Sequence, residues 1–429
     1  MKEWKTRILI RNIGLLVNVR DSALVRGHEM QDLRCISDGA MIIRDGVIEW
    51  FGAENELPAQ QQEPPFYQEV PFDSVINAEG GMVIPAFCDS HTHLLYPASR
   101  EQEMADRLNG MSYAEISARG GGILHSARKM ERISDEELLR DAEERLDNIL
   151  RTGTGTVEIK SGYGLSVSQE LRMLRLIRKL KERSPLTICA TFLGAHAFPP
   201  AYQEHPDQYV EILIGEMIPQ VAEEGLAEFV DVFCEKGFFS VAHTERILES
   251  ATRYGLKPRL HTNQFTHSGG ILSAIRHHAL SVDHLEVMNE HEIALLTYSS
   301  VIPTLLPGCA FFMDSPYPPA RAMIDAGLPV ALASDFNPGT NPSGDMKFVL
   351  SLACLKMKLT VAEALQAATL NGAAALGLGS SRGSIAVGKR ADLMITRPLA
   401  SPEMIPYAYT DPMVRHMMLG GAIMAPTTN

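Results

Sequence analysis

The chain has 429 residues, of which 45% are hydrophobic and 21% are charged, and its formal net charge is −13. This composition is that of a globular protein with more than one small core, and it excludes intrinsic disorder. The negative charge is spread along the chain without a long basic run, so neither a nucleic-acid groove nor a surface for anionic membranes is expected.

The first 78 residues alternate short strands with turns. "MKEWKTRILIRNIGLLVNV" reads as two strands, and "DGAMIIRDGVIEWFG" continues the pattern. The start lacks the apolar run and the small-residue cleavage site of an export signal. No stretch approaches the roughly 20 apolar residues of a membrane span. Six cysteines are scattered without CxxC spacing, which is typical of buried thiols in a reducing compartment. We therefore expect a cytoplasmic protein.

Eight short, near-continuous apolar runs follow between residues 79 and 382, and a helical stretch comes after each. Such runs are typical of strands buried on both faces of a parallel sheet. The runs are "MVIPAFCDSH", "TGTVEIKSG", "LTICATFLGAH", "EFVDVFCEKG", "KPRLHTNQ", "LSVDHLE", "VIPTLLPG" and "PVALASDF". The clearest helix is "SDEELLRDAEERLDNILRTG", in which Ser134 and Glu137 form a capping box and Gly153 follows the last turn. Eight such units predict an α/β protein with a (β/α)8 TIM-like barrel.

The tail from residue 383 to 429 resembles the first 78 residues in its pattern. "GSIAVGKRADLMITRP" and "VRHMMLGGAIM" again alternate short strands with turns. Two β-rich ends outside a barrel can pair with each other. We therefore expect a small β-sandwich domain built from residues 1–78 and 383–429, beside a barrel of residues 79–382.

Polar residues follow the predicted strands at the ends where such a barrel carries its active site. The first strand ends in His91 and His93. The fifth ends in His261 and the eighth in Asp335. Residues i and i+2 of a strand project to the same side. Three imidazoles and a carboxylate make a nitrogen and oxygen site suited to Zn²⁺ or Fe, so this combination indicates a metal centre.

Several motifs carry a resemblance to a known family: "PAFCDSHTH", "SGYG", "GAHA", "DHLE", "ASDFNPG" and "GSIAVGKRADLMI". The chain resembles the amidohydrolase superfamily over essentially its whole length. "SREQEM", "ARGGGIL", "VEIKSGYGL", "TFLGAHAFPPAY" and "SDFNPGTNPSG" are similar to one branch, which opens 4-imidazolone-5-propanoate to N-formimidoyl-L-glutamate in histidine degradation. The resemblance implies a metal-dependent hydrolase of a cyclic amide with one Zn²⁺ or Fe ion per subunit, a small anionic substrate and a possible homodimer.

The resemblance also implies roles for individual residues. His91, His93, His261 and Asp335 match the ligands of the ion. His284, at the end of the sixth strand, matches the family's base and forms the catalytic set with Asp335 and Gln264. The positions that contact substrate or product are matched by Arg100, Tyr163, His196, Gln264, Asn337, Gly339 and Thr340.

The chemistry of these side chains agrees with such roles. A metal ion lowers the pKa of a bound water toward about 7 and polarises a carbonyl. His284 can help to remove the water proton, and Asp335 can pass one to the departing ring nitrogen. The propionate of the substrate needs a cation, and the planar guanidinium of Arg100 pairs with a carboxylate. Asn337 and the backbone of Gly339 and Thr340 can supply neutral donors.

Simpler interpretations stay open for some of these residues. His196 could be a satisfied core histidine, Arg100 a surface charge and Tyr163 a turn residue, and Gly339 and Thr340 could be plain loop residues. Two alternative functions also stay open. One is a hydrolase or aminohydrolase of the same superfamily for an uncharged heterocycle, and the other is an inactive barrel that serves as a scaffold.

Two further positions bear on these alternatives. Lys160 stands two residues after Glu158, and we expect a structural ion pair there with a single metal, in preference to a carboxylated lysine that bridges two metals. Gln264 stands three residues after His261, where many deaminases of the superfamily have a glutamate. Its amide can hydrogen-bond but cannot donate an acidic proton, which counts against deamination of guanine, cytosine or adenosine.

Overall fold

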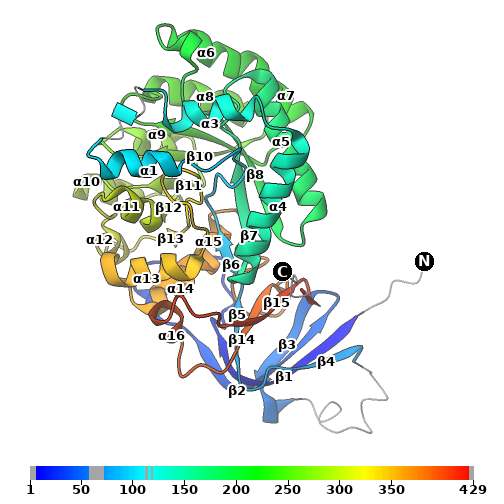
Figure 1. The fold of residues 1–429 in the computed structure, drawn as a ribbon. Coiled ribbons are helices and arrows are strands. Elements are labelled where there is room, and N and C mark those ends of the chain that lie inside the picture. The colour runs from blue at the N-terminus through cyan, green and yellow to red at the C-terminus, as the bar shows by residue number, and fades with distance from the viewer. Residues whose placement is uncertain (1–5, 58–71, 112–114, 117–118, 425–429) are drawn as a thin grey trace.

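The computed structural model describes residues 6–57, 72–111, 115–116 and 119–424. A barrel of parallel strands lies beside a smaller sheet whose strands come from residues 7–85 and 393–423 (Figure 1). The predicted fold, a TIM-like barrel with a β-rich unit from both termini, is confirmed. Within the described ranges, no helix is long and apolar enough to cross a membrane.

The barrel strands follow one another around the sheet in chain order, and each of the eight predicted runs contributes one strand. Neighbouring strands pair in parallel. The strands are β6 (Phe87–Asp89), β7 (Thr154–Lys160), β8 (Thr187–Ala195), β9 (Phe229–Cys234), β10 (Lys257–Thr262), β11 (Ser281–His284), β12 (Ile302–Leu305) and β13 (Ala331–Leu332). Every residue of β7 is buried, as the apolar run predicts for a strand covered on both faces.

The barrel closes where the chain after β6 meets the chain after β13. The backbone N–H of Asp335 donates to His91 O at 3.0 Å, and that of His93 donates to Phe336 O at 2.9 Å. Thr92 and Phe336 form an isolated parallel bridge between these contacts. This seam brings the ends of the first and last strands together, so residues far apart in the sequence meet at one rim.

One predicted strand divides into two. Of "MVIPAFCDSH", only β6 belongs to the barrel, whereas β5 (Met82–Pro85) pairs with β1 (Arg7–Val17) and β14 (Leu393–Thr396) of the smaller sheet. The change occurs at Ala86, whose N–H donates to Asp392 O, while the N–H of Phe87 donates to Gly153 O. Both sheets bury this segment, so the uniformly apolar sequence does not reveal where one ends and the other begins.

The smaller sheet interleaves strands from the two ends of the chain, in the order β16-β15-β14-β5-β1-β2-β3, with β4 beside β1. Its strands are β1 (Arg7–Val17), β2 (Cys35–Arg44), β3 (Val47–Ala53), β4 (Ser74–Asn77), β5, β14 (Leu393–Thr396), β15 (Val414–Leu419) and β16 (Ala422–Ile423). Ile10 of β1, Ile48 of β3 and Met418 of β15 belong to one buried apolar cluster. The sheet therefore curls around a shared core.

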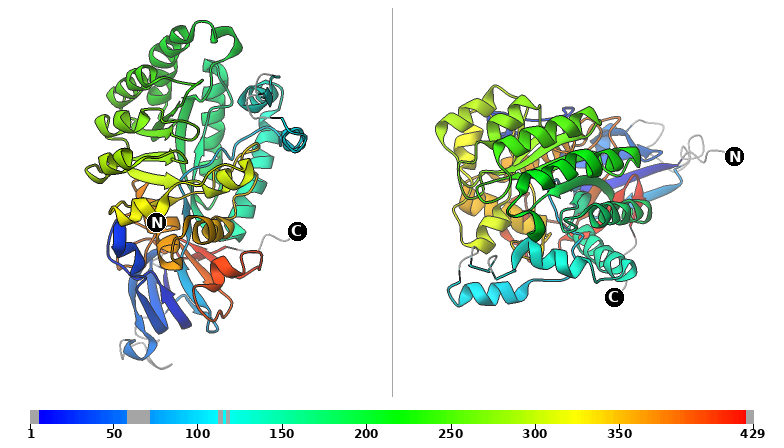
Figure 2. Two further views of the ribbon diagram at one scale, coloured as in Figure 1. Left: turned by 90° about the vertical axis from the view of Figure 1, so that its left-hand side faces the viewer. Right: turned by 90° about the horizontal axis from the view of Figure 1, so that it is seen from above.

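Helices fill the connections between the barrel strands and lie around the outside (Figure 2). In α4 the predicted capping box is present: Glu137 N donates to Ser134 Oγ at 3.2 Å, and Ser134 N donates to Glu137 Oε2 at 3.3 Å. The helices are α1 (Glu101–Leu108), α3 (Gly122–Met130), α4 (Asp135–Arg151), α5 (Val167–Arg183), α6 (Pro206–Ile212), α7 (Ile218–Glu223), α8 (Val241–Arg253), α9 (Gly270–Arg276), α10 (Glu290–Thr297), α11 (Pro307–Met313), α12 (Ala320–Asp325), α13 (Met346–Met357), α14 (Val361–Ala368), α15 (Leu370–Ala374) and α16 (Met404–Tyr407).

All six cysteines are free thiols. Those that are buried, as predicted, are Cys88, Cys189, Cys234 and Cys309. Cys354 is half-buried, and Cys35 is exposed, so the expectation of a buried thiol was wrong for Cys35. Cys35 begins β2 opposite Val17, whereas the pairing of β2 with β3 starts only at Gly39. It therefore has a neighbouring strand on one side only.

Candidate metal centre and active site

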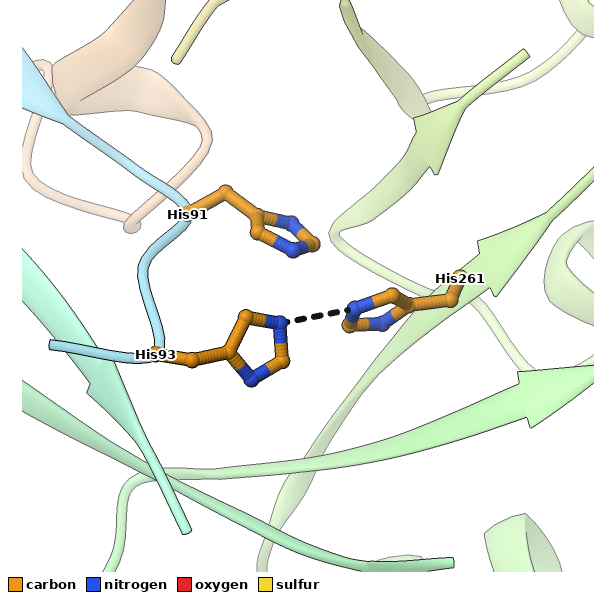
Figure 3. A group of neighbouring side chains, drawn as sticks. All are labelled: His91, His93 and His261. Atoms are coloured by element: carbon orange, nitrogen blue, oxygen red, sulfur yellow. Dashed lines mark hydrogen bonds between the residues drawn. The ribbon is translucent and has the colours of Figure 1, made fainter. Parts of the chain in front are cut away.

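Three histidines meet at the carboxyl ends of the barrel strands (Figure 3). One ring nitrogen from each of His91, His93 and His261 lies within 4.8 Å of the other two, and all three side chains are buried. The Nε2 atoms of His93 and His261 are 3.4 Å apart. Two donors bound to one ion at about 2.1 Å in a tetrahedral arrangement are separated by about 3.4 Å. The three imidazoles thus have the spacing of a metal site.

Asp335 joins this group from the end of the last strand. Its Oδ1 lies 3.7 Å from the Nε2 of His91 and 3.7 Å from the Nε2 of His93. Its backbone φ is 55°, in the left-handed region that residues other than glycine seldom adopt. Strained backbone of this kind occurs preferentially at functional sites. Burial raises the pKa of Asp335 above its usual range. Asp335 can therefore supply the oxygen ligand of the predicted set.

Two carboxylates behind the histidines orient the rings. His91 Nδ1 lies 2.7 Å from Asp283 Oδ2, and His261 Nδ1 lies 2.8 Å from Asp231 Oδ2. An ionised aspartate accepts the Nδ1 proton and leaves the Nε2 lone pair for an ion. The Nε2 of His91 is buried and has no hydrogen-bond partner among the residues that the structure describes. A buried orphan nitrogen at the centre of three imidazoles fits a bound metal ion.

The protonation state of the histidines also suits a metal. Burial, together with the nearby positive charge of Lys160, lowers the pKa of His91 well below its ordinary value, and burial does the same for His93. Metal ligation requires the neutral imidazole. The ring of His196 stacks on that of His93, with centroids 4.9 Å apart and an interplanar angle of 11°. Burial lowers the pKa of His196 to about 3, so it is neutral as well.

A buried network of charges holds the two orienting aspartates in place. Lys160 Nζ lies 2.8 Å from Glu158 Oε1 and 2.8 Å from Asp231 Oδ2. Arg259 Nη2 donates to Asp283 Oδ2 at 3.1 Å. The predicted ion pair of Lys160 with Glu158 is therefore confirmed, and the ammonium group is committed to carboxylates. Burial would raise the pKa of Asp231, but the charges of His261 and Lys160 hold it well below its usual range.

The sequence analysis did not single out Asp231, Asp283 or Arg259. A signal was available, because each is a charged residue inside an apolar strand, as in "FVDVF" and "SVDH". Charged residues are almost never fully buried unless they are paired. All three are fully buried here.

His284 approaches the same cavity from the end of β11. Its backbone φ is 87°, and its Nδ1 lies 3.4 Å from Glu286 Oε1. Burial alone would lower the pKa of His284, but the charge and hydrogen bond of Glu286, with Asp335 and Asp283 nearby, raise it above its ordinary value. A proton on Nδ1, facing Glu286, leaves Nε2 free as an acceptor. Glu286 was not predicted, although it stands only two residues after His284.

One cavity joins the histidine group to the predicted substrate residues. The predicted site residues that line it are His93, Arg100, Tyr163, His196, His261, Gln264, His284, Asp335, Asn337 and Thr340. The apolar residues Ile123, Phe233 and Phe265 complete the lining. Two predicted residues do not line the cavity. His91 is fully buried behind it, and Gly339 packs against the guanidinium of Arg100.

Arg100 is the cation of this cavity. It is buried, and its Nε and Nη1 have no hydrogen-bond partner within the described part of the chain. Glu103 Oε2 lies 3.5 Å from Nε. A Cβ at Gly339 would overlap the Nη2 of Arg100, so only glycine leaves room for the guanidinium. The N–H groups of Gly339 and Thr340 each donate to Asn337 Oδ1 at 2.8 Å, and so they shape the loop.

Glu170 of α5 holds the loop that carries Tyr163. Its carboxylate accepts the backbone N–H groups of Gly162, Gly164 and Leu165 at 3.1, 2.7 and 2.9 Å. The same loop orients His196, whose Nδ1 lies 3.0 Å from Gly162 O. Burial raises the pKa of Glu170. The sequence analysis missed this residue, because a glutamate in a helical stretch such as "SQELRML" looks like a solvated one.

A family model described as "Amidohydrolase family" matches residues 82–424. Curated relatives named "Imidazolonepropionase" include one from Flavobacterium johnsoniae that is 50% identical over 97% of this chain and 99% of its own length. Another, from Christiangramia forsetii, is 46% identical over 97% of this chain and 100% of its own length. A third, from Caldanaerobacter subterraneus subsp. tengcongensis, is 41% identical over 90% of this chain and 91% of its own length.

Solved structures share the fold at low identity. An adenosine deaminase from Xanthomonas campestris with bound zinc has a TM-score of 0.70 and 20% identity, with 97% of this chain and 92% of that chain covered. The guanine deaminase of E. coli has a TM-score of 0.69 and 17% identity, with 98% and 99% covered. At this identity the likeness concerns the fold alone.

Proposed function

Because the chain belongs to the amidohydrolase family and, within it, to the imidazolonepropionases, which are hydrolases of a C–N bond in a cyclic amide, we propose that its cavity opens the ring of 4-imidazolone-5-propanoate to give N-formimidoyl-L-glutamate. One feature of the cavity supports this proposal most directly. The buried, partly unpaired guanidinium of Arg100 faces the same cavity as the histidines of the candidate metal centre. A small substrate with a carboxylate and a hydrolysable ring matches that pair of features.

A single Zn²⁺ or Fe ion would be held by His91, His93, His261 and Asp335. The spacing of the three imidazoles and the orphan Nε2 of His91 support this ligand set. When bound, the ion supplies Lewis acidity, which makes water a stronger acid and draws electron density from the lactam carbonyl.

The proton transfers fall to residues of the chain. His284, with its Nδ1 side turned toward Glu286, offers Nε2 to the cavity and accepts a proton from the attacking water. The water oxygen bonds to the carbonyl carbon. The hydroxyl group that this adds to the carbon gives its remaining proton to Asp335, and as the C–N bond breaks Asp335 delivers that proton to the ring nitrogen. His284 releases the first proton to solvent as the new carboxylate forms, so the elements of one water are added across the bond. Thr340 Oγ1 donates to Asp335 Oδ2 at 3.3 Å and steadies the carboxylate.

Different residues bind the two ends of the substrate, the propionate and the ring. Arg100 pairs with the propionate through a charge-assisted, planar contact. Tyr163 and His196 border the ring from the side of His93. Asn337 and Gln264 lie on the cavity wall, where their amides can hydrogen-bond polar atoms of the ring.

The first experiment is incubation of the purified protein with 4-imidazolone-5-propanoate while the loss of ring absorbance is followed, with and without a chelator. Arg100→Ala should raise KM by about tenfold or more and lower kcat less, because the propionate does not react. Arg140→Ala, at an exposed arginine, is the matched control. An unchanged KM for Arg100→Ala, or full turnover of a ring that lacks the propionate, would contradict the proposal and favour a hydrolase of uncharged heterocycles.

A further inference from the structure

His284, Glu286 and Cys309 form a second group of metal-ligating side chains beside the first. A ring nitrogen, a carboxylate oxygen and a thiol sulfur from these residues all lie within 4.8 Å of one another, and all three residues are buried. Cys309 belongs to α11 and has no part in the proposed hydrolysis. Its Sγ accepts a hydrogen bond from Gln264 Nε2 at 3.4 Å, so the sulfur lies beside the active-site cavity.

Two observations besides proximity point to a bound cation. The Oε2 of Glu286 is buried without a hydrogen-bond partner in the described ranges, and its side chain is only 2% exposed. An unpaired buried carboxylate oxygen is costly unless a cation or a donor satisfies it. The other oxygen, Oε1, lies 3.4 Å from His284 Nδ1. That separation is the one expected for two donors bound to one ion at about 2.1 Å.

We propose that His284, Glu286 and Cys309 form a second, weaker site for a borderline-soft divalent cation such as Zn²⁺, and that its occupation inhibits the enzyme. Imidazole, thiolate and carboxylate together suit Zn²⁺ and Co²⁺. The cation binds the thiolate, so the thiol proton of Cys309 passes to solvent on binding.

The inhibition rests on the proposed function, because it acts through His284. A cation on Nδ1 obliges the neutral ring to carry its proton on Nε2. His284 then has no lone pair to offer to water, and hydrolysis stops although the first centre is intact. The second site itself does not depend on the identity of the substrate.

Titration of the metal-depleted full chain with Co²⁺ tests the site. The first ligand set contains no sulfur, so the first equivalent should give no thiolate-to-cobalt charge-transfer band. The second equivalent should give this band in the near ultraviolet.

Cys309→Ser should abolish the band, whereas Cys35→Ser, at an exposed thiol, should leave it unchanged. Absence of the band in the unsubstituted protein, or its persistence in Cys309→Ser, would overturn the proposal. Cys309→Ala replaces Cys309→Ser should the latter fail to fold.

Turnover with excess Zn²⁺ tests the consequence. Zn²⁺ beyond one equivalent should inhibit the unsubstituted protein, and Cys309→Ser should raise the Zn²⁺ concentration for half-inhibition by at least about tenfold, since loss of a ligand weakens a site at least as much as loss of an outer partner. Activity with one equivalent should be unchanged. Equal inhibition of the unsubstituted protein and of Cys309→Ser by Zn²⁺ would refute the proposal that occupation of the second site inhibits the enzyme. A cobalt band at the second equivalent, together with no turnover even at one equivalent of metal, would instead count against the proposed function and leave the second site standing.

Discussion

Asp231 makes two hydrogen bonds to His261, one to its ring and one to its backbone. The Oδ2 of Asp231 lies 2.8 Å from the Nδ1 of His261, and its Oδ1 accepts the backbone N–H of the same residue at 3.1 Å. The two contacts hold both the ring and the strand that carries it. Lys160 Nζ lies 2.8 Å from the same Oδ2 and keeps the carboxylate ionised. The orientation of one predicted metal ligand is thus set by residues of two other barrel strands, β7 and β9, which lie on either side of β8.

Asp231→Asn should weaken metal binding by about 10- to 100-fold. The asparagine amide can donate to Nδ1 of His261, which shifts the ring proton to Nε2 and blocks the lone pair that an ion needs. Competition with a chelator measures the effect. Asp207→Asn, at a side chain that is 75% exposed, is the control. An affinity for metal equal to that of the unsubstituted protein would show that the carboxylate does not set the tautomer.

Gly339→Ala should raise KM by about tenfold or more, with a smaller effect on kcat. The added Cβ overlaps the Nη2 of Arg100, so the guanidinium or the loop must move. Steady-state kinetics with 4-imidazolone-5-propanoate check this outcome. At Gly215 a Cβ meets nothing within 4 Å, so Gly215→Ala controls for the change of residue type. A KM within twofold of the unsubstituted value would mean that Gly339 does not position Arg100.

Glu170→Gln should destabilise the protein by about 2–4 kcal/mol, because the carboxylate accepts three backbone N–H groups and an amide NH₂ cannot replace both oxygens. Unfolding in urea measures this loss. The catalytic efficiency should fall in parallel, since the loop carries Tyr163 and contacts His196. Glu182→Gln, at an exposed position of the same helix, should change neither quantity. If Glu170→Gln unfolded with the same free energy as the unsubstituted protein, the loop would keep its conformation without the carboxylate of Glu170.

Lys389 should make stability depend on pH in the alkaline range. Its Nζ donates to Ser22 O and Ser384 Oγ at 2.7 Å each, and burial lowers its pKa to about 8. An unfolded lysine has a pKa of about 10.4. Between these values the unfolded state binds more protons than the folded state, so the contribution of Lys389 to stability rises with pH.

The comparison of the unsubstituted protein with Lys389→Met isolates this effect. The difference in unfolding free energy, unsubstituted minus variant, should be larger at about pH 10 than at about pH 7.5. Lys179→Met, at an exposed position, should give the same difference at both pH values. A pH-independent difference for Lys389→Met would show that the ammonium is not destabilised by burial.

The architecture was predictable because the barrel strands are short, apolar and separated by helices. Periodicity and caps locate such units without knowledge of their partners. The place where β5 leaves one sheet and β6 joins the other was not predictable. Ala86 marks it only through a backbone hydrogen bond to Asp392, which comes from the far end of the chain.

The predicted site residues share one rim because parallel strands of a barrel end on the same side. Which carboxylates contact the Nδ1 atoms of the histidines depends instead on how the strands pair with one another. Asp231 reaches His261 because β9 pairs with β10, and Asp283 reaches His91 across the barrel. Gly339 was expected to contribute a backbone donor, yet its N–H is taken by Asn337 and its role toward Arg100 is one of space. The packing of Gly339 against Arg100 has no pattern in the sequence.

The line along which the barrel closes has a mechanical consequence. His91 and His93 follow the first strand, whereas Asp335 follows the last, and their backbones already bond across that line. An ion bound by these side chains would cross-link the first and the last strand of the barrel, as a covalent bond between them would. Its binding energy would add to folding at that boundary by mass action. Removal of the ion would then abolish activity and also lower the stability of the folded barrel.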